Sequence, residues 1–169
     1  MVFYIFYIKR LQNRRYLLKY IIMNDYEKQL ESSPIIAFVP GGDSMWPTLK
    51  HAGQSVFIER KPNERLKVDD VPFYKRANGQ YVLHRIVEVR ENDYVLCGDS
   101  QFTLEYGVTD DMIFGVLKGY YKGKKYIDAN SKKSKRLALF LRKHNFIKKV
   151  AVKVHFKLKS LKGKRVEKK

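Results

Sequence analysis

The chain has 169 residues, of which 44% are hydrophobic and 14% aromatic, so it can form one packed domain with appendages and is not a disordered chain. Its formal net charge is +18. The single cysteine, Cys97, excludes an internal disulfide and is typical of a reducing compartment. We interpret Cys97 as a buried, small apolar residue.

Residues 1–22 alternate apolar runs with basic residues. The longest uncharged run, residues 1–8, is far shorter than the roughly 20 residues that span a bilayer. We therefore expect no transmembrane helix and a cytoplasmic protein, peripheral at most to the inner membrane surface. Residues 24–27 are typical of a helix start, which suggests translation from Met23. Residues 1–33 are thus predicted to be an extension that ends in a short helix over 24–32.

The next hundred residues contain short apolar, β-branched runs separated by turn signals. They predict strands over 34–39, 54–58 and 70–74, a hairpin of 81–89 with 94–100, and a last hairpin of 112–121 with 124–127. Short strands at this spacing predict a mainly β domain over residues 34–131, built as a twisted, partly closed antiparallel sheet.

Within this domain, Gly41 and Gly42 precede Ser44, and Pro47 follows it. The glycines give backbone freedom and the proline fixes the chain, so the serine hydroxyl can point outward while its N–H faces an oxyanion. A Gly-Pro turn whose serine caps a helix is the other interpretation. The turn alone leaves both open.

A serine nucleophile needs a base, which a third group usually orients. His84 lies in the predicted strand 81–89, and Asp99 follows the strand that pairs with it. Paired strands can bring these two side chains together. A histidine inside a strand can instead be a satisfied core residue, and the spacing does not decide between the two.

Four stretches, in order, carry a resemblance to a known family. They are Gly-Asp-Ser-Met-Trp-Pro-Thr-Leu (42–49), Leu-Lys-Val-Asp-Asp-Val (66–71), Leu-His-Arg-Ile-Val (83–87) and Gly-Asp-Ser (98–100). Over residues 34–127 the chain resembles the type I signal peptidases and the self-cleaving repressor peptidases, and within them the subgroup with a histidine base. Asp69 stands where that family usually has glycine.

The resemblance implies a serine endopeptidase with a signal-peptidase-like fold. Ser44 would be the nucleophile, His84 the general base and Asp99 the acid that orients it, with Asp110 or Asp111 as the alternative acid. The implied substrate is a leader or signal-like peptide that binds as an extended strand. No cofactor or metal is implied.

The resemblance also assigns the nucleophile turn to Gly42, Asp43 and Met45. Many relatives have a serine at the position of Gly42, and its hydroxyl helps to stabilise the oxyanion. Here backbone N–H groups such as that of Ser44 would do so alone, and losing one donor typically costs about 100- to 1000-fold in rate. Met45 and Trp46 would line a pocket for small side chains.

Residues 132–169 form a basic extension with 16 Lys and Arg and one acid, Glu167, which leaves the rest of the chain at +3. The pattern predicts a helix over 136–147 and a strand over 147–158. The extension is expected either to contact an anionic membrane or acidic partner, or to be a solvated tail beside the sheet. Nucleic acid is disfavoured because no helix-turn-helix pattern is present, and the oligomeric state stays open.

A different class of function also remains open. The chain can be a binding module that keeps the fold without the chemistry and uses its basic tail to hold membrane or nucleic acid.

Overall fold

The computed structural model describes residues 26–49 and 54–166. The predicted start at Met23 and most of the extension 1–33 lie outside the described residues. The elements in chain order are α3 (Tyr26–Ser32), β1 (Ile35–Phe38), β2 (Val56–Arg60), β3 (Pro72–Lys75), β4 (Tyr81–Leu83), β5 (Arg85–Val89), β6 (Tyr94–Cys97), β7 (Glu105–Val108), the 3-10 turn η1 (Asp110–Met112), β8 (Ile113–Lys122), β9 (Lys125–Asp128), α4 (Lys132–Lys143) and α5 (Asn145–Val166).

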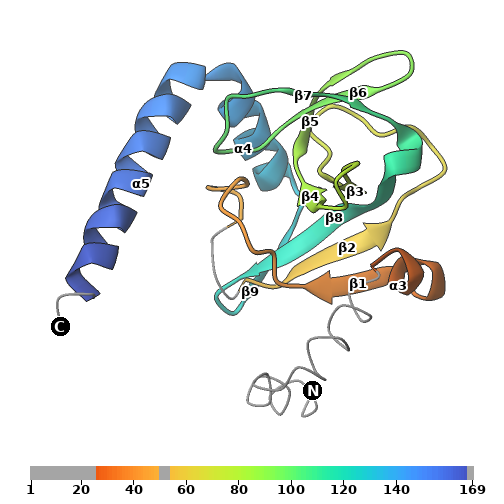
Figure 1. Ribbon diagram of the computed structural model, residues 1–169, viewed down its shortest axis with the longest axis horizontal. Helices are drawn as coiled ribbons and strands as arrows, with labels where there is room; N and C mark the ends of the chain where they lie inside the picture. The colour runs from red at the N-terminus through yellow and green to blue at the C-terminus, as the bar shows by residue number, and fades with distance from the viewer. Residues whose placement is uncertain (1–25, 50–53, 167–169) are drawn as a thin grey trace, which may run out of the picture.

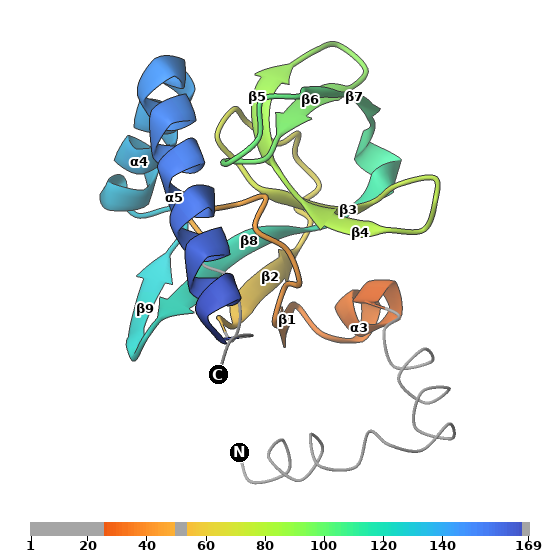
Figure 2. The same cartoon turned by 60° about the vertical axis from the view of Figure 1, so that its left-hand side comes forward.

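The strands form two antiparallel sheets. The larger has the order β1-β2-β8-β3-β4, with β9 also paired to β8, and the smaller has the order β5-β6-β7. Figures 1 and 2 show the smaller sheet above the larger one, with α4 and α5 together on one side. The predicted mainly β, antiparallel architecture is confirmed, as is the short helix predicted over 24–32, whose described part is α3 (Tyr26–Ser32). The predicted partial closure is wrong, because β1 and β4 remain edge strands of an open path.

The strand predicted over residues 81–89 is in fact two strands in different sheets. β4 ends at Leu83 in the larger sheet, β5 begins at Arg85 in the smaller one, and His84 lies between them. The hairpin of β5 with β6 is confirmed, with Arg85 opposite Cys97. His84 is therefore not inside a strand, as its sequence predicted, but at the switch between the two sheets.

Strand β3 separates two hydrophobic clusters. Phe73 belongs to the cluster on the larger sheet and Tyr74 to the cluster that includes Ile86 and Leu96 of the smaller sheet. Successive side chains of a strand point to opposite faces, so one dipeptide serves both clusters. Tyr74 thereby comes to lie beside His84.

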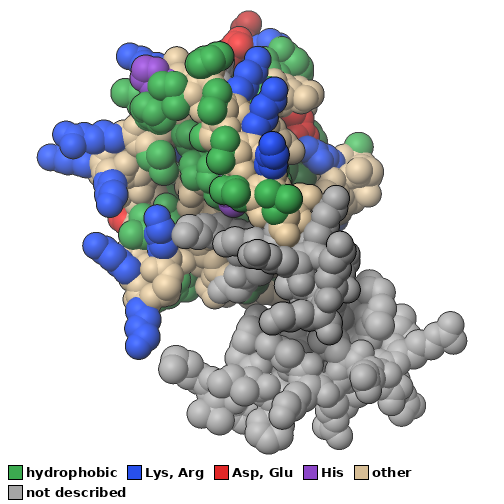
Figure 3. All heavy atoms as spheres, turned by 90° about the vertical axis from the view of Figure 1, so that its left-hand side faces the viewer, with side chains coloured by type: hydrophobic (Ala, Val, Ile, Leu, Met, Phe, Trp, Pro, Cys, Tyr) green, Lys and Arg blue, Asp and Glu red, His purple; other side chains and the backbone are tan. Residues whose placement is uncertain are grey.

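The described part of the C-terminal extension is helical except at His144, where α4 ends and α5 follows. A helix was predicted over 136–147, and α4 confirms it for residues 136–143; α4 begins earlier, after Ser131, whose side chain accepts a hydrogen bond from the Ser134 N–H. The strand predicted over 147–158 is wrong, since this segment belongs to α5. Its alternating apolar residues coincide with helical spacing: Val150 and Val154 are exposed on one face, and Val152 is buried on another. Figure 3 looks onto this side of the molecule.

Among the described helices, none is both long enough and apolar enough to cross a membrane.

Candidate active site

A cavity of ≈ 550 Å³ lies where the loop after β1 faces the end of β4. Both Ser44 and His84 line it, together with Phe38 from β1 and Tyr81 from β4. The predicted nucleophile and base therefore share one hollow, although they come from separate parts of the chain. Ser44 is partly buried and His84 is buried.

The turn after β6 holds the loop that carries Ser44. The Ser44 carbonyl accepts hydrogen bonds from the Ser100 N–H (2.8 Å) and hydroxyl (3.1 Å), and the Asp43 carbonyl accepts one from that hydroxyl (2.8 Å). Gly98 permits this approach, because a Cβ there would lie 2.7 Å from the Ser44 carbonyl oxygen. Within the described part of the chain, the N–H and hydroxyl of Ser44 donate no hydrogen bond.

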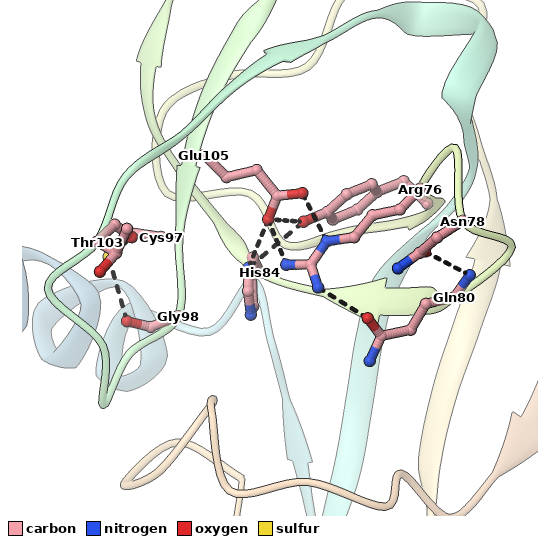
Figure 4. Close-up of polar contacts among 9 residues, drawn as sticks. Arg76, Asn78, Gln80, His84, Cys97, Gly98, Thr103 and Glu105 are labelled. Atoms are coloured by element: carbon pink, nitrogen blue, oxygen red, sulfur yellow. Dashed lines mark hydrogen bonds and ion pairs between the residues drawn. The ribbon is translucent and has the colours of Figure 1, made fainter.

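Glu105 and Tyr74 hold one nitrogen of His84. Nδ1 lies 3.3 Å from Glu105 Oε2 and 3.4 Å from the Tyr74 hydroxyl oxygen. Figure 4 shows the Glu105 carboxylate pointing toward the His84 ring. Tyr74 donates its own proton to Glu105 Oε2 over 2.7 Å, so both groups present acceptors to Nδ1. Nδ1 therefore carries the ring proton and Nε2 the lone pair. Nε2 lies on the side of the ring away from Glu105.

Arg76 keeps Glu105 ionised. Its Nε donates to Oε1 over 2.7 Å and its Nη2 to Oε2 over 2.6 Å, a bidentate pair. Burial alone would raise the pKa of Glu105, but the hydrogen bonds from Arg76 and Tyr74 outweigh it and lower that pKa. The carboxylate at His84 is therefore negatively charged near neutral pH.

The protonation state of His84 is the one that a general base requires. Burial lowers the pKa of His84 below its usual 6.5, and the negative charge of Glu105 only partly offsets this effect. The imidazole is thus neutral near pH 7 and able to accept a proton at Nε2.

Asp99 is not the carboxylate that orients His84. It is 3% exposed and accepts hydrogen bonds from Arg85 Nε (2.8 Å) and Nη2 (2.7 Å) and from the Thr48 hydroxyl. Arg85 begins β5 opposite Cys97, two residues before Asp99, so Arg85, and not His84, pairs with Asp99. The expected pairing of His84 with Asp99 is corrected to His84 with Glu105.

The alternative acids lie in η1 and have other partners. Asp110 accepts a hydrogen bond from the Tyr94 hydroxyl (3.0 Å) and pairs with Lys61 (2.9 Å). Asp111 accepts a hydrogen bond from Thr109. Over the ranges that the structure describes, neither contacts His84.

The four stretches that carried the family resemblance meet at one buried ion pair. Arg85 joins Asp99, approaches Thr48 (3.3 Å) and donates from Nη1 to the Asp69 carbonyl (2.8 Å). Asp69 has a φ of 78°, in the left-handed region that favours glycine, and it occupies the position where the family usually has glycine. The cluster fixes the loop that carries Ser44 against both sheets.

The other residues of the turn around Ser44 contact either the cavity or helix α5. Gly42, Asp43 and Met45 line the cavity. Trp46 does not; its ring stacks on His155 of α5, with 4.2 Å between ring centroids. The expectation that Trp46 lines the specificity pocket is therefore wrong, because α5 covers that side of the loop. An added Cβ at Gly42 would have open space.

The sequence did not predict that Tyr74, Arg76 and Glu105 belong to the site. The alternation of Leu104, Glu105 and Tyr106 was the only local sign of strand β7. Glu105 reaches the site because Leu96 pairs with Ile86 on one side and with Glu105 on the other. That register depends on long-range pairing, which no local pattern contains.

No group of three or more His, Cys, Asp or Glu side chains that could hold a metal ion occurs among the residues described. No protein-family model matches the chain, and no curated protein matches it.

Proposed function

We propose that the protein is a serine endopeptidase, similar to the histidine-base signal peptidases, that cleaves a leader or signal-like peptide. The observation that carries the proposal is the shared cavity of Ser44 and His84, with His84 anchored at Nδ1 by Glu105. Nucleophile, base and orienting acid are the parts that such chemistry requires.

The proposed reaction follows from these positions. Ser44 Oγ attacks the peptide carbonyl carbon while His84 Nε2 takes the hydroxyl proton, and the carbonyl oxygen becomes an oxyanion facing backbone N–H groups. His84 then gives the proton to the leaving amine as the C–N bond breaks. Water releases the acyl group from Ser44 by the same steps. Glu105 stabilises the imidazolium that forms in between.

The cavity walls favour an extended substrate. Phe38 lies on β1 and Tyr81 on β4, and these two strands are the edges of the larger sheet. Edge strands present backbone N–H and C=O groups that can pair with an added peptide strand. A substrate lying between β1 and β4 would thus be held by its backbone and read by its side chains.

We place the enzyme in the cytoplasm, where the substrate would be the leader of a cytoplasmic peptide or a segment of a partner protein. The single cysteine is consistent with this, because a chain without a disulfide is typical of a reducing compartment.

Mass spectrometry of a diverse peptide mixture tests the proposal. Wild type is expected to produce cleavage products, and Ser44→Ala is expected to produce none, because the variant lacks the attacking oxygen while keeping the loop. Ser32→Ala is the matched control: Ser32 lies at the end of α3 and bonds only to its own helix carbonyls in the described structure, so cleavage should be unchanged.

The same experiment can reject the mechanism. Identical product profiles from wild type and Ser44→Ala would favour the alternative, a binding module without peptidase chemistry. The peptides cut by wild type alone would report, from their flanking residues, which side chains the cavity accepts.

A further inference from the structure

Helix α5 turns polar residues toward the protein. Its inner face consists of Lys148, Val152, His155 and Lys159, at helical spacing. Lys148 is buried, with Nζ 3.5 Å from the Gly98 carbonyl oxygen. His155 stacks on Trp46, and Lys159 pairs with Asp43. Three of the four inner contacts are therefore made by polar side chains.

The opposite face of α5 is apolar and exposed. At about 100° per residue, six bulky side chains fall within a stripe about 120° wide. They are Phe146, Ile147, Val150, Val154, Leu158 and Leu161. Phe146 is 79% exposed and Leu158 55%. Figure 3 shows hydrophobic side chains running down this side of the molecule, with Lys and Arg side chains around them.

The stripe is bordered by positive charge. Lys149, Lys153 and Lys157 follow its edge, and within the described residues no acidic side chain pairs with Lys153 or Lys157. The whole extension 132–169 carries 16 basic residues and one acid. Apolar side chains that project between lysines match a surface that is negatively charged outside and apolar just beneath.

We propose that the outward face of α5 docks on an anionic lipid membrane, with the stripe inserted between headgroups and the lysines at the phosphates. Charge decides against a second copy of the chain, because two such extensions would repel one another. The phosphate backbone of a nucleic acid would satisfy the lysines but would leave the stripe in water. This proposal does not depend on whether Ser44 is catalytic.

Docking would set the distance between membrane and cavity. The inner face of α5 touches Asp43, which directly precedes Ser44, and Trp46, which lies two residues after it. The nucleophile loop would therefore lie one helix width, about 10 Å, behind the lipid surface. A peptide that emerges from the membrane or lies on it would then extend only a short distance from the lipid surface to reach the cavity.

Flotation of the full-length protein with lipid vesicles tests this proposal. The protein is expected to float with vesicles that contain phosphatidylglycerol and not with vesicles of phosphatidylcholine alone. The triple variant Phe146→Ala, Ile147→Ala and Leu158→Ala should bind at least about tenfold more weakly, because it removes apolar area while keeping helix propensity. Lys153→Gln with Lys157→Gln should weaken binding by about fivefold for each lysine.

A matched triple variant controls for loss of surface hydrophobicity elsewhere. Ile35→Ala, Val89→Ala and Tyr106→Ala change exposed apolar residues on the strands, and binding should stay at the wild-type level. Far-UV circular dichroism identifies any variant that fails to fold. If the apolar triple variant does not fold, the variant of the two exposed lysines decides. Because every variant keeps the rest of the chain, any contribution from outside α5 is common to all.

Three results would overturn the proposal. They are absence of flotation with anionic vesicles, flotation that neither the apolar triple nor the lysine pair weakens, and binding to duplex DNA that exceeds vesicle binding and ignores the apolar triple.

Discussion

At the scale of single residues, the surroundings of His84 predict a pH dependence. In the proposed mechanism only neutral His84 can accept the Ser44 proton, and burial lowers the pKa of His84 below its usual 6.5. Cleavage should therefore be fully active at pH 7 and fall as acid protonates His84. Glu105→Gln removes a carboxylate that raises this pKa, so the fall should move to lower pH and the rate should drop about a hundredfold. A pH profile of kcat/KM for both proteins measures this; superimposable profiles would contradict it.

Burial of His84 also makes the folding stability fall at acid pH, in the same direction as the predicted activity. A histidine whose pKa is lowered in the folded state contributes stability that is fully present above pH 6.5 and lost as the pH falls through its folded pKa.

We expect Asp99 to contribute to the stability of the fold, whereas we expect Glu105 to contribute to the rate of cleavage. Asp99→Asn leaves the guanidinium of Arg85, itself 8% exposed, without its counter-charge. Breaking a buried ion pair in this way should cost about 3 kcal/mol of unfolding free energy. Urea denaturation measures the loss, with the exposed Asp111→Asn as a control expected within about 0.5 kcal/mol of wild type. Unchanged stability in Asp99→Asn would refute the structural role.

At the scale of elements, the segment before β3 contains a strained turn. Asp69 adopts a φ of 78° and pairs through its side chain with Arg142 of α4. Asp69→Gly and Asp69→Ala both lose that pair, so their difference isolates the backbone. Glycine adopts this conformation freely, and Asp69→Gly should be more stable than Asp69→Ala by about 1 kcal/mol. Thermal unfolding of the two variants decides; equal stabilities would contradict the prediction.

The sequence predicted elements whose signals are local. The hairpin of β5 with β6, the hairpin of β8 with β9 and helix α4 follow from turn residues and from helical spacing. The boundary between β4 and β5 left no local mark, because residues 81–89 are mostly apolar or β-branched and contain no Gly or Pro. The residues of α5 satisfy both a strand and a helix period, and only the folded chain selects the helix.

The residues of the candidate site likewise fall into those with a local sequence signal and those without one. Ser44 and His84 stand in recognisable stretches, whereas Glu105 stands in none and arrives through the register of β6 with β7. Asp99 was a reasonable choice from the hairpin, but the chain changes sheets one residue too early for it to meet His84.

At the scale of the whole molecule, α5 is attached to the nucleophile loop through an aromatic stack. Trp46 is the only tryptophan in the chain, so its fluorescence reports this contact directly. His155→Ala should shift the emission to longer wavelength as water reaches the indole. His144→Ala, which removes a ring that packs on Phe140, should leave the emission unchanged. Identical spectra for all three proteins would show that α5 does not rest on the loop.

The position of His84 between the two sheets also has an evolutionary consequence. Inserting or deleting one residue near it would turn the imidazole to the opposite face and shift the register of one sheet against the other. An exposed turn such as the one between β8 and β9 could accept an added residue, but the spacing of Leu83, His84 and Arg85 could not change without these effects. A change of chain length that removed His84 from the cavity would also disrupt the fold. Substitution of His84 itself is therefore the change that could abolish the proposed site and keep the architecture.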